Sequence, residues 1–148
     1  MLRVRPLKRS QIARIFPLLL QVLPGIALAE WKTFAARLIR RSEADGMSGM
    51  IVVETDSGTI RGGFIYEVEE LPDRRRRLVV RHVVIPPLGQ TMVAGAIQSA
   101  VEEIVRAQAC DFVHVELPSD AEWEADYFTR RGHHAVRGAE FGDAALLR

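Results

Sequence analysis

The sequence lacks the features expected of a membrane, disulfide-bonded or nucleic-acid-binding protein. It has one cysteine, Cys110, so no disulfide can form within the chain, which suits a reducing compartment. It contains no run of about 18 apolar residues, the length that a membrane-spanning helix requires. Its net charge is +1, so bulk electrostatics do not favour a nucleic-acid partner. These absences predict a cytoplasmic protein that has no membrane partner and argue against nucleic acid as its ligand.

Internal repeats and low-complexity linkers are also missing. The chain has 148 residues, of which 48% are hydrophobic and 26% charged. That length and composition are typical of one soluble domain with a real hydrophobic core. We therefore expect residues 1–148 to form a single domain.

The most informative stretch lies between Leu78 and Leu117. Residues 78–85 are rich in β-branched side chains and stop at two prolines, which predicts a strand. Apolar residues recur at helical spacing over 92–108, and 112–117 is again typical of a strand. A strand, helix and strand in this order indicate a parallel strand pair covered by the helix. The start of that helix would point out of the sheet, where its first N–H groups can hold an anion.

The rest of the chain predicts further strands and helices around this unit. The strands are expected near 2–7, 50–55, 60–70, 133–136 and 144–147, and the helices at about 11–22, 29–44 and 121–131. Ser10, and either Ser119 or Asp120, are the expected helix caps. Gly62 and Gly63 predict a bulge or a close backbone approach. This order predicts an α/β (α+β) domain, a mixed sheet with helices on both faces.

Four consecutive arginines, residues 74–77, precede the central strand. Such a run could bind phosphate, but it follows a strand that carries Glu67, Glu69 and Glu70. In a hairpin these acids would face the arginines across the turn. We therefore interpret the run as a solvated turn.

Two segments resemble the GNAT superfamily of acyl-CoA-dependent N-acetyltransferases. Residues 84–97 (VIPPLGQTMVAGAI) resemble that family's strand end, proline, pyrophosphate loop and helix start. Residues 125–133 (ADYFTRRGH) resemble its short helix with paired aromatics, basic turn and glycine. The element order agrees over nearly the whole chain. The resemblance implies a mixed, mostly antiparallel sheet with a splayed central pair of parallel strands.

The resemblance also implies a reaction. The protein would transfer an acetyl group from acetyl-CoA, its co-substrate, to a primary amine of a small molecule or protein. A backbone N–H near Val84 would polarise the acyl carbonyl, and the helix start would hold the pyrophosphate. The cofactor-binding residues that the resemblance implies are Val84, Ile85, Gln90, Thr91, Met92, Val93 and Ala94.

The sequence departs from the family at two positions. Met92 stands where the loop usually has a glycine, and Phe128 stands where a tyrosine often protonates the departing thiolate. Tyr127 is the candidate catalytic tyrosine, although adjacent helical residues point about 100° apart. Its alternative role is that of an aromatic at the rim of the core. A second hypothesis is therefore a catalytically impaired GNAT-fold module that binds a ligand or another protein.

A proton acceptor is also needed, since an amine such as that of lysine has a pKa near ~10. His82 on the central strand is the candidate base, with Glu67 or Glu69 as alternatives, although a buried structural role also fits His82. His133 and His134 predict no metal site, because adjacent strand residues face opposite sides. A homodimer is possible, but the sequence indicates no surface for it.

Overall fold

The computed structural model describes residues 1–137. The helices and strands are β1 (Leu2–Pro6), the 3-10 helix η1 (Arg9–Gln11), α1 (Ile12–Leu19), α2 (Leu28–Asp45), β2 (Ser48–Thr55), β3 (Ile60–Glu70), β4 (Arg76–Val84), α3 (Gln90–Gln108), β5 (Phe112–Leu117), α4 (Glu122–Arg130) and β6 (His134–Arg137). The six strands form one sheet in chain order, with antiparallel pairs from β1 to β4 and parallel pairs from β4 to β6. The expected mixed sheet is confirmed, and the strand predicted at 144–147 lies outside the described residues.

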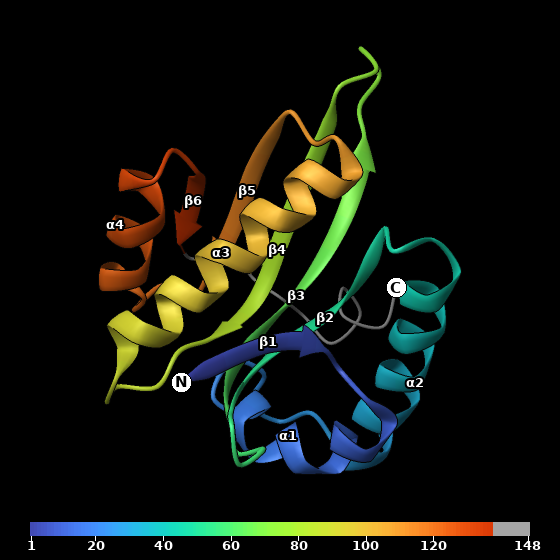
Figure 1. Ribbon diagram of the computed structural model, residues 1–148, viewed down its shortest axis with the longest axis vertical. Coiled ribbons are helices and arrows are strands. Elements are labelled where there is room, and N and C mark those ends of the chain that lie inside the picture. The colour runs from blue at the N-terminus through green and yellow to red at the C-terminus, as the bar shows by residue number, and fades with distance from the viewer. Residues whose placement is uncertain (138–148) are drawn as a thin grey trace.

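Each face of the sheet is covered by helices and has its own apolar core. Figure 1 shows α3 crossing β4 and β5, with α4 beside β6. On this face Phe64, Leu78, Ile97 and Phe128 are fully buried. On the other face α1 and α2 bury a second cluster around Trp31, whose indole N–H donates to a backbone carbonyl of α1 at 2.7 Å. No helix within residues 1–137 is both long and apolar enough to cross a membrane.

The parallel pair β4–β5 is joined over only part of its length. Its register runs from Arg77 opposite Phe112 to Val80 opposite Val115. Both strands continue beyond that point, β4 to Val84 and β5 to Leu117. The splayed central pair that the family resemblance implies is therefore present, and its opening lies at the carboxyl ends of the two strands.

A bulge in β4 accompanies the opening. Between β3 and β4 the register passes from Ile65 opposite Arg81 to Gly63 opposite Val84, so β4 gains one residue. His82 lies in this bulge and has a φ of 52°, a left-handed conformation that is uncommon outside glycine. The close approach predicted at the two glycines is also confirmed. A Cβ on Gly62 would lie 2.5 Å from the Val84 carbonyl oxygen, so β3 can approach the bulged strand only without a side chain there.

The predicted side-chain caps are wrong. Ser10 lies inside η1, and the Lys8 N–H instead donates to the side-chain Oε1 of Gln11 at 3.0 Å. Before α4 the chain makes a backbone turn, in which the Ala121 N–H donates to Pro118 at 3.1 Å, so neither Ser119 nor Asp120 provides a side-chain cap. In both places hydrogen bonds within a local turn replace the predicted side-chain cap at the start of the helix.

The predicted solvated turn is confirmed for Arg74 and Arg75, which are exposed, whereas Arg76 and Arg77 are half-buried and begin β4. Arg76 pairs with Glu70 at 3.1 Å, and Arg77 forms an ion pair with Glu69. These contacts neutralise the two arginines that enter β4.

Candidate active site

The loop after β4 connects this strand to the start of α3. Gly89 occupies the N-cap position with a φ of 72°, a left-handed conformation that suits glycine. The Met92 and Val93 N–H groups both donate to the Gly89 carbonyl, at 3.1 and 3.2 Å. Gln90 and Thr91 are the first helical residues, and their N–H groups have no acceptor within an α-helix. No acidic residue lies in this first turn, so its donors and the helix dipole favour an anion.

The predicted cofactor-binding residues divide between two environments. Met92 is 66% exposed, so its side chain lies in solvent rather than inside the turn. Thr91 is exposed beside it, whereas Val93 and Ala94 are buried against the sheet. Val84 ends β4 and is buried, and Ile85 is half-buried. The structure therefore places Thr91 and Met92 on the open side of the helix start, with Gln90 half-buried beside them.

An ion pair spans the splayed strands. Arg81 and Glu116 follow the last paired residues of β4 and β5, and Arg81 Nε donates to Glu116 Oε2 at 2.7 Å. Arg81 also lies 3.7 Å from a Glu67 carboxylate oxygen and 3.9 Å from one of Glu69. Sequence reasoning missed Glu116. Its signal was the alternation in 112–117, which puts valine and leucine on one face of β5 and His114 and Glu116 on the other.

His82 lies on the α2 face of the sheet. It is 5% exposed and lines a cavity of about 50 Å³ together with Phe34 and Leu38 of α2 and with Glu67. Burial, with a smaller contribution from the Arg81 charge, lowers the pKa of His82 to about 4. The imidazole is therefore neutral near pH 7.

Tyr127 and Phe128 lie on the opposite face. Phe128 is fully buried in the α3-side core, whereas Tyr127 is half-buried at its edge. The Tyr127 hydroxyl points at α3, 3.8 Å from the position a Cβ on Gly95 would occupy. The structure therefore does not bring Tyr127 and His82 together, since they lie on the two sides of the sheet.

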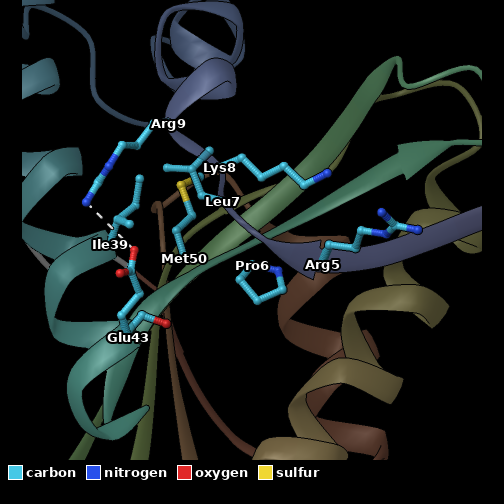
Figure 2. Close-up of a pocket in the computed structure, with 9 residues that line it drawn as sticks. Arg5, Pro6, Leu7, Lys8, Arg9, Ile39, Glu43 and Met50 are labelled. Carbon is cyan, nitrogen blue, oxygen red and sulfur yellow. Dashed lines mark ion pairs between the residues drawn. The ribbon is translucent and has the colours of Figure 1, made fainter.

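A separate hollow of about 520 Å³ lies between β1 and α2, and none of its lining residues comes from β4, β5 or α3. Figure 2 shows Arg9 directed at Glu43, while Lys8 and Arg5 point away from that pair. The Arg9–Glu43 distance is 3.7 Å. This hollow is therefore separate from the splayed strands and from the start of α3.

Comparison with known proteins gives no match at the level of sequence. No model of a known protein family matches the chain. No curated protein matches it either.

Solved structures, in contrast, match nearly the whole chain. Glucosamine-6-phosphate N-acetyltransferase from Arabidopsis thaliana has a TM-score of 0.71 and 16% identity, covering 95% of this chain and 98% of its own. An aminoglycoside 6′-N-acetyltransferase from Acinetobacter baumannii has a TM-score of 0.69 and 14% identity, covering 96% and 97%. An aminoglycoside N-acetyltransferase in complex with CoA has a TM-score of 0.76 and 14% identity, covering 96% and 93%. The chain therefore has the fold of the GNAT N-acetyltransferases.

Proposed function

We propose that this protein is an N-acetyltransferase that transfers an acetyl group from acetyl-CoA to a primary amine. The observation that supports this most is the opening of β4 and β5 beyond Val80 and Val115, one loop away from the first turn of α3. An acyl-CoA needs a slot for its extended arm and an anion site for its pyrophosphate. The two features lie at the same end of the central strand.

The start of α3 fits a pyrophosphate through its backbone. Gln90 and Thr91 would hold the phosphate oxygens with N–H groups that the helix leaves without an acceptor. Met92 and Val93 would contribute less, because their N–H groups already donate to Gly89. The exposed side chain of Met92 does not fill this turn, so the missing glycine does not close it.

The chemistry is an acyl transfer. The amine nitrogen bonds to the carbonyl carbon, the carbon–sulfur bond breaks, the amine loses a proton and the thiolate gains one. A backbone N–H near Val84 would stabilise the charge that develops on the carbonyl oxygen. Much of the rate would come from holding the two reactants in position.

Glu116 is the residue we assign to the amine proton. Its carboxylate lies at the first position beyond the paired strands and is partly accessible, with 17% of the side chain exposed. A carboxylate there can attract an ammonium group and accept its proton, directly or through water. His82 remains a candidate base, but it is only 5% exposed, so an incoming amine reaches it less readily than it reaches Glu116. Tyr127 remains the candidate proton donor for the thiolate.

One observation favours the alternative, a catalytically impaired module with this fold that binds a ligand or a protein partner. Phe128 fills the position where the resemblance leads us to expect a catalytic tyrosine, and it is fully buried without a hydroxyl group. Turnover distinguishes the two functions. CoA thiol release should be followed with glucosamine 6-phosphate and an aminoglycoside, the acceptors that the names of two structural neighbours give, and with a broad panel of other amines. Cofactor binding without thiol release on a broad amine panel would favour the alternative.

Calorimetry with acetyl-CoA tests the cofactor site. Thr91→Glu places a carboxylate beside the proposed pyrophosphate, and we expect affinity to fall by about tenfold or more, which is ~1.4 kcal/mol. Thr91→Gln controls for side-chain size. Ser99→Glu controls for charge, because Ser99 is exposed two turns further along α3. Both controls should bind within about threefold of wild type. Equal affinity of Thr91→Glu and Thr91→Gln, or no binding by wild type, would contradict the proposal.

A further inference from the structure

Two histidines meet on the face of the sheet opposite α3 and α4. His114 of β5 lies directly across from His134 of β6 in the parallel register. Val113 and Val115, the neighbours of His114, are buried in the α3-side core, so the alternation of a strand directs His114 away from that core. The Nδ1 atoms of the two rings lie 3.0 Å apart and the ring centres 5.0 Å apart. Two imidazole nitrogens are therefore held side by side on this face.

The spacing of the two nitrogens fits a shared transition-metal ion. Imidazole is a common ligand of Zn²⁺, Ni²⁺ and Cu²⁺, and its nitrogen lies about 2.0–2.1 Å from such an ion. At that bond length, a separation of 3.0 Å corresponds to an angle of about 95° between the two bonds at the ion. Neighbouring ligands in a square-planar site make an angle of about 90°, and this geometry is typical of Ni²⁺ and Cu²⁺.

The surroundings of His114 favour the state that binds a metal. Burial lowers the pKa of His114, so its ring is neutral near pH 7, as a metal ligand must be. Glu116 Oε1 lies 3.6 Å from His114 Nε2, and metal-binding histidines commonly have a carboxylate at their second ring nitrogen. Arg77 and Arg81 also act on this ring, but each forms an ion pair with a glutamate, which reduces their repulsion of a cation.

The protons of the pair can be rearranged to admit an ion. One Nδ1 must carry a proton for the two rings to be hydrogen-bonded. Glu116 favours the proton of His114 on Nε2, so His134 is the donor. His134 is exposed, so its proton can move to its own Nε2 through water, which leaves both Nδ1 lone pairs available. The ion would then replace the hydrogen bond with no net gain or loss of protons.

We propose that His114 and His134 bind one divalent transition-metal ion, of the Ni²⁺ and Cu²⁺ type, through their Nδ1 atoms. Within residues 1–137 no three His, Cys, Asp or Glu side chains are grouped so as to hold a metal, so water would complete the coordination shell. His133 takes no part, because its Nε2 lies 2.8 Å from Gln98 Oε1 of α3, on the other face. The inference does not depend on acetyl transfer.

Calorimetry with Ni²⁺ tests the site in the full chain, prepared without a histidine tag. Wild type should bind one Ni²⁺ per chain. His114→Gln and His134→Gln should each lower the affinity by about tenfold or more, since the loss of even a group that supports a metal ligand commonly costs that much. His133→Gln is the matched control, because it removes a neighbouring histidine from the other face, and it should bind within about threefold of wild type.

Three results would overturn the inference. The first is the absence of one-to-one Ni²⁺ binding by wild type. The second is an unchanged affinity in either His114→Gln or His134→Gln. The third is an equal loss in His133→Gln, which would place the ion elsewhere. None of these results bears on acetyl-CoA binding or turnover, so this inference and the proposed function fail separately.

Electron paramagnetic resonance with Cu²⁺ counts the nitrogen ligands directly. With one equivalent of Cu²⁺, the wild-type spectrum should show coupling to two imidazole nitrogens, and each single variant should show coupling to one. A variant that is only destabilised would keep both couplings, so this measurement separates loss of a ligand from loss of stability. Coupling to a single nitrogen in wild type would contradict a site shared by His114 and His134.

Discussion

The paired and the splayed parts of β4–β5 differ in the contacts that neighbouring residues make between the two strands. From Arg77 to Val80 the two strands are paired along their backbones, and alternate side chains such as Leu78 and Val80 are fully buried. One residue further on, backbone pairing gives way to the Arg81–Glu116 ion pair. The first part stabilises the fold. The second leaves room between the strands and puts charged groups at its edge, which is where we place the reaction.

The largest effect on stability is expected from a substitution in the paired part. Leu78→Ala removes a fully buried side chain from the α3-side core, so the free energy of unfolding should fall by about 2–5 kcal/mol. Urea unfolding measures this loss. At a temperature where the variant is still folded, its acetyl-CoA affinity should match that of wild type. If the folded variant bound acetyl-CoA more weakly than wild type, the paired part would contribute to cofactor binding as well as to stability, which would contradict this division.

An effect of about 2 kcal/mol is expected from His82, which lies in the bulge between the two parts. Its pKa is lowered from 6.5 to about 4. As pH falls below 6.5 the unfolded chain gains a proton that the folded protein does not take up until about pH 4. The neutral histidine therefore contributes fully to stability above pH 6.5 and less as pH falls, with about 2 kcal/mol lost at pH 5.

His82→Asn isolates that contribution, since asparagine tolerates the left-handed backbone of residue 82. Between pH 7 and pH 5 the wild type should lose about 2 kcal/mol more stability than the variant, as measured by urea unfolding at each pH. Parallel profiles for the two proteins would show that His82 does not titrate as its burial implies.

The smallest effect on free energy is expected in the splayed part. Glu116→Gln should lower turnover by about tenfold, or ~1.4 kcal/mol, while unfolding changes by less than about 1 kcal/mol. Glu70→Gln is the matched control, because Glu70 also pairs with an arginine of β4, Arg76, but lies at the far end of β3 from the opening. Steady-state thiol release with a responsive amine gives the comparison. Equal losses in both variants would remove Glu116 from its proposed role.

Sequence patterns predicted the regular elements of the fold well. The strand at 112–117 has the expected bounds, because alternation of apolar and polar residues is a local signal of a half-buried strand. The pairing of Arg76 and Arg77 with glutamates was also predictable, since the hairpin brings those residues opposite one another.

The site was less predictable, because it depends on departures from regular structure. The bulge at His82 arises from strand register, which the residues of β4 do not encode on their own. The importance of Glu116 depends on where pairing with β4 ends. The exposure of Met92 was not predictable, because the loop motif shows only that a side chain stands where a glycine is usual and not where that side chain points.

Gly62 has a consequence beyond the shape of its own strand. A Cβ at this residue would meet not only the Val84 carbonyl oxygen at 2.5 Å but also a methyl group of Val93 at 2.8 Å. One hydrogen atom on β3 thus sits where the end of β4 and the first turn of α3 converge. A side chain at residue 62 would push the end of β4 and the first turn of α3 apart. The relative position of the slot between the strands and the anion site therefore depends on a residue that contacts no substrate.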